Sequence, residues 1–139
     1  MKRVVITGVG ACTSVGESAD EFFSSILKGQ QGNKPLVHLD ATRFNTQVAY
    51  EREQVGEHNG KTRSSDFLLS ALNEAVADAG LSDTASEFPV YIGTGLRELR
   101  TLEVAALANE TLDVEQLDYT NAVQSILPQC KDIYTISNA

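Results

Sequence analysis

The 139-residue sequence has no tryptophan, one methionine, and only two cysteines and two histidines. Cys12 and Cys130 are far apart, and neither stands at zinc-ligand spacing from another cysteine or a histidine. We therefore expect two free thiols, buried or half-buried, in a protein of the reducing cytoplasm, and no metal site. His38 and His58 have no acid or nucleophile beside them, so we expect surface histidines rather than catalytic ones.

Basic residues and long apolar runs are also scarce. The sequence has 11 Lys and Arg against 19 Asp and Glu, which gives a net charge of −8. Nucleic acid is excluded as a partner, because phosphate binding needs a basic face. No apolar run reaches the roughly 18 residues of a membrane-spanning helix, so no membrane association is expected. The N-terminal stretch MKRVVITGVG is β-branched and interrupted by Gly8 and Gly10, which indicates a buried strand rather than a signal peptide.

What the sequence does contain is an alternation of strand and helix patterns. Ser18 and Glu21 have the spacing of a helix capping box, and Gly29 and Gly80 stand where helices end. Strands separated by helices predict an α/β sheet with helices on its faces, although three core strands are few against the usual roughly four to six. In chain order we expect a strand at Lys2–Val9, a helix at Ala19–Lys28, a short strand or extended loop at Phe44–Ala49, a long helix capped by Ser65, a strand at Val90–Gly93, a helix at Leu96–Ala108, a short helix or turn at Asn121–Pro128, and a strand at Ile133–Ser137.

Two glycine motifs resemble nucleotide-binding turns but fail on spacing. Gly8 and Gly10 follow the first expected strand, but a dinucleotide fingerprint needs a third glycine where Thr13 stands. The GTG stretch at 93–95 fails the same test, because Glu98 occupies the third position. We interpret these glycines as turn-formers after buried strands.

Charged side chains give a second set of candidates. Arg97 and Arg100 follow the GTG stretch and could meet an anionic ligand. The alternative is that both are solvated, with Arg100 pairing with Glu103 one helical turn on. No carboxylate is embedded in an apolar segment, so we expect solvated helix faces for Asp66, Glu74, Asp78, Glu98 and Glu103.

Several segments, taken in order, resemble the β-ketoacyl-[acyl carrier protein] synthases. The resemblance spans nearly the whole chain, and it depends on the ordered set rather than on any one segment. It implies a thiolase-like layered α/β fold, with this chain as the N-terminal part of the first half: an incomplete mixed sheet flanked by helices. The segments are MKRVVITGVGACTSVG, Ser18–Gly29, LDATRFNTQVAYE, SDFLLSALNEAVADAGL, VYIGTGL and YTISNA.

The resemblance also implies an activity. Members of the family are acyltransferases that condense an acyl thioester with malonyl carrier protein, by decarboxylative Claisen condensation, in fatty acid or polyketide synthesis. A cytoplasmic homodimer with the third strand near its interface is implied, as are acyl carrier protein as partner and the absence of a cofactor. The carrier would need a basic patch, either at Lys61 and Arg63 or outside this sequence.

Leu96, Arg97 and Asn138 fall at positions that the resemblance assigns to substrate binding. Many members of the family place small residues after the GTG stretch, whereas this sequence continues with Leu96, Arg97 and Glu98. This departure puts the usual chain-length pocket in doubt and favours a short or polar acyl substrate.

The nucleophile of the family is a cysteine that directly follows a strand like IYTISNA. It stands at a helix N-terminus, where the dipole and free N–H groups favour the thiolate. The expected cysteine would follow Ala139, outside the sequence, as would the two histidines that assist decarboxylation. Cys130 precedes the strand and is no substitute. We therefore expect residues 1–139 to be an N-terminal β-ketoacyl synthase-like domain, truncated just before the nucleophile and inactive alone.

Three origins of that ending are open: a cut or truncated product, a fold completed by a second chain, or an isolated N-terminal portion of a ketosynthase. Two other functions are also open. A non-catalytic, chain-length-factor-like partner subunit would keep the fold but replace the nucleophile, and a thiolase-type acyltransferase would use coenzyme A thioesters. The SNA ending favours a nucleophile-bearing enzyme, and the segment FNTQVAYE with the capped first helix favours the ketosynthase.

Overall fold

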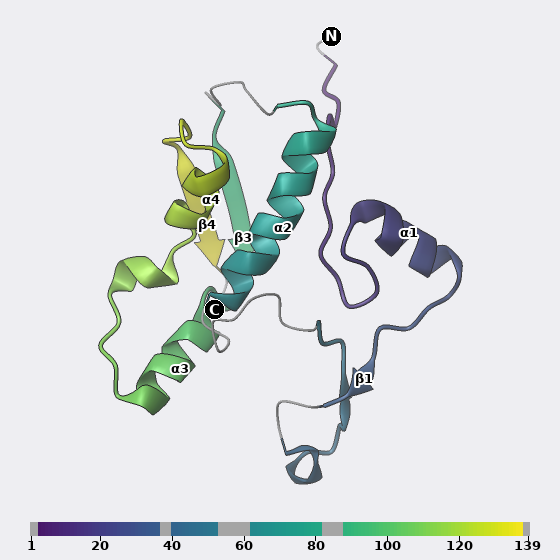
Figure 1. Ribbon diagram of the computed structural model, residues 1–139, viewed down its shortest axis with the longest axis vertical. Coiled ribbons are helices and arrows are strands. Elements are labelled where there is room, and N and C mark those ends of the chain that lie inside the picture. Colours follow the sequence, from purple (N-terminus) through teal and green to yellow (C-terminus); the bar gives the residue numbers. More distant parts are fainter. Residues whose placement is uncertain (1–2, 37–39, 53–61, 82–87, 138–139) are drawn as a thin grey trace.

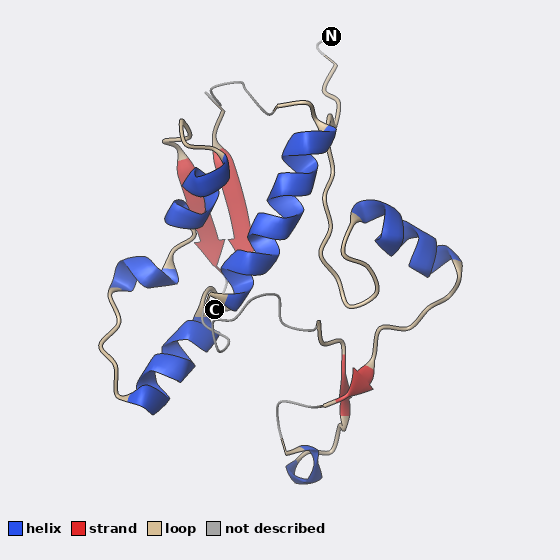
Figure 2. Cartoon of the chain, viewed as in Figure 1, coloured by secondary structure: helices blue, strands red, loops and turns tan. Residues whose placement is uncertain are grey.

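The computed structural model describes residues 3–36, 40–52, 62–81 and 88–137 (Figure 1). The expected alternation of helices and strands is confirmed for every element after the first. Figure 2 shows the elements, which are α1 (Ala19–Leu27), β1 (Lys34–Pro35), the 3₁₀ turn η1 (Ala41–Arg43), β2 (Val48–Ala49), α2 (Arg63–Asp78), β3 (Val90–Thr94), α3 (Leu99–Ala108), the 3₁₀ turn η2 (Val114–Leu117), α4 (Thr120–Ile126) and β4 (Ile133–Ser137).

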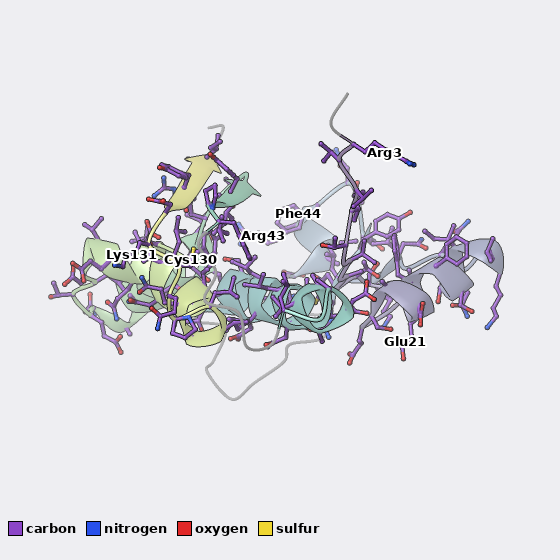
Figure 3. The ribbon with its side chains drawn as sticks, turned by 90° about the horizontal axis from the view of Figure 1, so that it is seen from above. Arg3, Glu21, Arg43, Phe44, Cys130 and Lys131 are labelled. Atoms are coloured by element: carbon purple, nitrogen blue, oxygen red, sulfur yellow. The ribbon has the colours of Figure 1, made fainter. Side chains whose placement is uncertain are left out.

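The core lies between the β3–β4 pair and two helices. β3 and β4 are parallel and in register, from Val90 opposite Ile133 to Thr94 opposite Ser137. Helices α2 and α4 cover one face of this pair (Figure 3). Leu68, Leu72 and Val76 lie on one stripe of α2 and pack against the buried cluster. The cluster consists of Ile92, Tyr119, Val123, Leu127 and Cys130, with Leu68, Leu72 and Val76 of α2 against it.

The opposite face of the β3–β4 pair is open. Side chains alternate along β3, so that Ile92 is 7% exposed and Tyr91 is 67% exposed. Tyr91 lies directly opposite Tyr134, and the two rings stack with their centres 5.2 Å apart. Ile136 is exposed as well. The pair therefore buries one face only.

The buried strand expected at Lys2–Val9 is not formed. Lys2 lies outside the described residues, and residues 3–10 belong to no strand in the part of the chain that the structure describes. Val4 is 95% exposed and Ile6 is 85% exposed. An apolar, β-branched run specifies an extended backbone but not its partner. Within the described ranges, the strand that pairs with β3 is β4.

The N-terminal segment is held by α2 instead of by a sheet. Figure 1 shows it running alongside that helix. The N–H of Val9 donates to the carboxylate of Asp78 at 2.9 Å. The carboxylate of Glu74 accepts from the N–H groups of Ala11 and Ala19, both at 2.8 Å. The expectation that Glu74 and Asp78 are merely solvated is therefore wrong, because they satisfy backbone donors that no strand satisfies.

Gly8 and Gly10 allow this close approach. A Cβ atom at Gly8 would overlap the carbonyl oxygen of Ala75, and one at Gly10 would overlap that of Ala71. Both alanines belong to α2 and have small side chains themselves. The two glycines are therefore packing residues against a helix rather than the turn-formers that the sequence suggested.

Helix ends follow their local signals more closely. The hydroxyl of Ser18 accepts from the N–H of Glu21 at 3.2 Å, which confirms the N-cap of α1. The Glu21 carboxylate accepts from the N–H of Glu17 at 2.9 Å, one residue before the position that a capping box uses. Gly29 and Gly80 both have a φ of +67°, as predicted for glycines that end helices.

Between α1 and α2, the described residues 28–36 and 40–52 have little regular structure, as expected. β1 and β2 form an antiparallel pair with Lys34 opposite Ala49. The strand considered at Phe44–Ala49 forms only at Val48–Ala49. This pair is separate from β3–β4. Of the helices in the described ranges, none is long and apolar enough to cross a membrane.

Replacing Gly10 with alanine tests the close approach to α2. The methyl group would overlap the helix backbone, so Gly10→Ala should lower the free energy of unfolding by about 1–3 kcal/mol, as overpacking usually does. Urea unfolding followed by circular dichroism measures this. Thr7→Ala, at an exposed site in the same segment, should stay within about 0.5 kcal/mol of the wild type. Equal effects of the two substitutions would contradict the packing role.

Candidate functional site

The carboxyl ends of β3 and β4 lie side by side, because Thr94 is paired with Ser137 at the last position of the register. Helix α2 runs opposite to these strands, so its first turn reaches the same edge (Figure 1). Ligands of open α/β sheets bind outside the carboxyl ends of strands. We call this region the carboxyl edge and define it by residues 62–65, 94–98, Tyr119 and Ser137.

Glu98 is the buried centre of the carboxyl edge, with 1% of its surface exposed. Its carboxylate accepts from the N–H of Ser65 at 2.5 Å and from the hydroxyl of Thr101 at 3.1 Å. Thr62 precedes α2 in a left-handed conformation and makes no side-chain cap bond. Glu98 therefore caps α2 from 33 positions away along the chain. Two expectations are wrong: Ser65 lies in the first turn of α2 rather than capping it, and Glu98 is not solvated.

The turn between β3 and α3 is held on both sides. Arg97 has a φ of 49°, in the left-handed region. Its N–H donates to the hydroxyl of Thr94 at 3.0 Å, and its carbonyl oxygen accepts from the hydroxyl of Ser64 at 3.0 Å. The hydroxyls of Ser64 and Tyr119 lie 3.1 Å apart, within hydrogen-bond distance. These bonds fix the turn backbone to α2 and to the start of α4.

The structure brings two of the predicted substrate-binding residues to this edge. Leu96 is 71% exposed, and Arg97 is exposed beside it. Asn138 lies outside the described residues. Arg100 pairs with Glu103 at 3.1 Å, so the plainer of the two readings of this arginine is confirmed.

Cys130 lies away from the carboxyl edge, and Cys12 belongs to the N-terminal segment before α1. Cys130 is fully buried and precedes β4 (Figure 3). The length of β4, about 13 Å, therefore separates this cysteine from the carboxyl edge. Cys12 is half-buried, and both thiols are free, which confirms the expectation for them. His38 and His58 lie outside the described residues.

Arg63, one of the two residues considered for carrier docking, is engaged within the chain. Its guanidinium donates to the carbonyl of Arg52 at 2.7 Å and lies 5.4 Å from the centre of the Phe67 ring. Arg52 lies 5.3 Å from the same ring and pairs with Glu17 at 3.0 Å. The other docking candidate, Lys61, lies outside the described residues.

A hollow of about 500 Å³ lies beside the carboxyl edge and is lined from α2, α3, η2 and α4. Thr62, Ser65 and Thr101 line it on the side of the edge. Four carboxylates and no basic side chain are among the described residues that line it. These carboxylates belong to Asp66, Glu110, Glu115 and Asp118.

Asp118 lies just before α4 and is one of the carboxylates that line the hollow. Its carboxylate accepts from the hydroxyl of Thr120 at 2.7 Å and from the N–H of the same residue at 2.8 Å. The pKa of Asp118 lies below its ordinary 3.8, mainly because its carboxylate accepts from the Thr120 hydroxyl. Burial raises this pKa, whereas the backbone bonds and the charge of Arg97 lower it further. Asp118 is therefore an ionised cap beside the turn.

Sequence reasoning missed Glu98 and Tyr119 as parts of the carboxyl edge, and Thr101 as a residue bonded to it. Their partners are remote, since Thr101 meets the N–H of Thr62 39 positions away and Tyr119 meets Ser64 55 positions away. No local spacing could have marked them. A glutamate directly before a helix is a common solvated residue, so the sequence around Glu98 favoured the wrong reading.

Comparison with known proteins identifies a family. The family described as "Beta-ketoacyl synthase, N-terminal domain" matches residues 1–130 of the chain. The 3-oxoacyl-[acyl-carrier-protein] synthase 2 of Staphylococcus aureus is 31% identical over 115 residues, which cover 75% of this chain. The protein of that description from Synechocystis is 33% identical over 113 residues, which cover 73% of this chain. The chain spans 28% and 27% of the lengths of these two relatives.

A solved structure shares the fold. The protein described as "The ishigamide ketosynthase/chain length factor" superimposes with a TM-score of 0.69 at 20% sequence identity. The match covers 98% of this chain and 39% of that chain. The expected fold class, part of a thiolase-like α/β fold, is thereby confirmed.

Removing the charge of Asp118 should give a pH-dependent loss of stability. Asp118→Asn should lower the free energy of unfolding near neutral pH by about 1 kcal/mol, as loss of a helix cap does. The folded-state pKa lies below 3.8, so the stabilisation is full above that value and is lost as the pH falls through the folded-state pKa.

Urea unfolding of both proteins across a pH series measures this difference. The difference should be constant down to about pH 5 and shrink below about pH 4. Asp132→Asn, at an exposed residue, serves as the control and should show no comparable loss. A difference for Asp118→Asn that grows on acidification would contradict the assigned direction.

Proposed function

Since this chain belongs to the β-ketoacyl synthase family, we propose that the complete protein is an acyltransferase, a 3-oxoacyl-acyl carrier protein synthase of fatty acid or polyketide synthesis. The observation that carries the proposal is the match of residues 1–130 to the N-terminal domain of the family. The in-register ends of β3 and β4 support it, because they form an edge that can present a nucleophile. Residues 1–139 are proposed to be the N-terminal domain, inactive alone.

The proposed chemistry divides between this chain and residues outside its sequence. A cysteine after Ala139, at the start of a helix, would attack an acyl thioester, release its thiol as the original C–S bond breaks, and hold the acyl group on its own sulfur. Decarboxylation of malonyl carrier protein then supplies a carbanion. The carbanion attacks the acyl carbonyl, the new carbon–carbon bond forms, and the thiolate leaves. Histidines outside the sequence would assist the decarboxylation.

We assign substrate contact to Leu96, Arg97 and Asn138. Leu96 is 71% exposed at the end of β3, and Arg97 is exposed next to it. A bulky apolar residue and a cation at this edge suit a short or polar acyl group better than a long chain. The acid-lined hollow on the neighbouring side would turn anionic thioesters toward the open side of the edge.

A cytoplasmic homodimer with acyl carrier protein as partner completes the proposal. In the described part of the chain, β4 pairs with β3 on one side, so its other edge offers free N–H and C=O groups. That edge is the proposed region of the dimer contact. The net charge of −8 and the engagement of Arg63 within the chain suggest that an acidic carrier docks on residues outside this sequence.

A non-catalytic partner subunit is the second candidate. The fold match to a protein described as a ketosynthase/chain length factor favours keeping it. The residue that follows Ala139 in the gene separates the two candidates, because a partner subunit would lack the cysteine. The match to the β-ketoacyl synthase family favours both over a thiolase-type enzyme.

The complete protein should release CO₂ and form a 3-oxoacyl carrier protein from acyl and malonyl thioesters, as followed by mass spectrometry of the carrier. Replacing the residue after Ala139 with alanine should lower kcat by at least about 10³-fold, because the covalent step is lost. Product that forms only when a second ketosynthase chain is added supports the partner subunit. Absence of product under both conditions contradicts the proposed function.

A further inference from the structure

We propose that Glu98 is a positioning residue, which fixes the turn 95–97 against the N-terminus of α2 and thereby sets where Leu96 stands at the carboxyl edge. The inference rests on the proposed function, in which Leu96 contacts the acyl group. It adds a residue whose side chain is buried and reaches no substrate itself.

Neutral donors hold the buried carboxylate of Glu98 in the part of the chain that the structure describes. Its two donors in the described part of the chain, the N–H of Ser65 and the hydroxyl of Thr101, are both neutral. A buried charge is costly unless donors and dipoles compensate it. The positive end of α2 contributes to that compensation, because the carboxylate accepts from the N–H of Ser65 in the first turn of this helix. The position of Glu98 is therefore tied closely to the start of α2.

Thr101 extends this tie to the beginning of α3. Its hydroxyl oxygen accepts from the N–H of Thr62 at 2.7 Å while the hydroxyl donates to Glu98. Thr101 is 3% exposed, so water does not replace these bonds easily. The starts of α2 and α3 are thus joined through one carboxylate and one hydroxyl.

Leu96 stands between two anchored points of the backbone. Before it, Thr94 is paired with Ser137 at the end of β3 and its hydroxyl accepts from the N–H of Arg97. After it, the side chain of Glu98 is bonded to α2. Arg97 itself is left-handed, a conformation that persists in a non-glycine residue only when its surroundings impose it. The side chain of Leu96 makes no part of the buried cluster and is 71% exposed. Its position therefore follows from the anchors rather than from its own packing.

The consequence for function is selectivity between acyl chains. A hydrophobic contact discriminates by roughly tenfold or more for one methylene. That discrimination requires the side chain of Leu96 to stay at a fixed position, because small displacements near the reacting atoms change rates strongly. A turn released from α2 would let Leu96 move and would make long and short acyl groups more nearly equal.

The test uses the complete enzyme with Glu98→Gln, which removes the charge but keeps the shape. The amide nitrogen of Gln cannot accept from the Thr101 hydroxyl and can only donate to it, so the bond to a charged acceptor is lost. The matched control is Glu103→Gln, the same change at an exposed residue of α3. A short and a long acyl thioester compete, and the ratio of their kcat/KM values is measured. Hydrogen exchange at the Ser65 and Arg97 amides is measured alongside.

Glu98→Gln should move the selectivity ratio by about tenfold toward unity and speed exchange at both amides, whereas Glu103→Gln should change neither. A merely structural role would lower both kcat/KM values by one factor and leave the ratio unchanged. An unchanged ratio in folded Glu98→Gln overturns the proposal, whatever the exchange shows. If Glu98→Gln does not fold, the same selectivity ratio is measured for Thr101→Val, which should also move it toward unity. Thr101→Ser, which keeps the hydroxyl, should have the wild-type ratio, and an unchanged ratio in Thr101→Val overturns the proposal.

Failure of the proposed function is distinguishable from failure of this inference. A wild-type enzyme that condenses no pair of thioesters removes the proposed function and leaves no selectivity ratio to measure. Exchange then decides whether the turn is positioned by Glu98. Faster exchange at the Arg97 amide in Glu98→Gln supports the positioning, and equal protection in the two proteins overturns it.

Discussion

The in-register parallel pairing of β3 with β4 is the constraint on which the rest of the structure depends. Parallel neighbours cannot be joined by a tight turn, so α3, η2 and α4 must form the crossover between them. The crossover returns α4 to the same face that α2 covers, and the core closes between them. The same register brings the two carboxyl ends together, which creates the edge where the turn after β3 meets the end of β4.

Helix α2 carries a different function on each side. Its leucine stripe packs against the β3–β4 pair, while Ala71, Ala75, Glu74 and Asp78 receive the N-terminal segment. Its first turn is capped by Glu98, which lies between β3 and α3. Helix α2 therefore contacts the core, the N-terminal segment and the carboxyl edge, and fixes their positions relative to one another. The open face of β3–β4 and the exposed N-terminal segment show how much apolar surface this chain leaves uncovered.

The sequence predicts what is encoded locally. The helix ends at Gly29 and Gly80 can be predicted because glycine readily adopts the left-handed backbone found there. The core-facing stripe of α2 can be read from the 3.6-residue repeat of a helix. Pairing is not local. The run VVITGV specifies an extended chain, but only the surroundings decide whether a strand or a helix satisfies its amides. The prediction of a solvated Glu98 was wrong for the same reason, because the carboxylate meets a donor 33 positions away. The family resemblance succeeded where these patterns could not, since it compares the order of segments along the whole chain.

The central claim is that the end of β4 aims a nucleophile that lies directly beyond this sequence. The most direct measurement is to load the complete enzyme with an isotopically labelled acyl thioester, quench it in acid, digest it and locate the acyl group by mass spectrometry. We predict the label on a cysteine that directly follows Ala139, in the peptide that contains β4. Label on Cys12 or Cys130, or no covalent label with active substrate, would contradict the account.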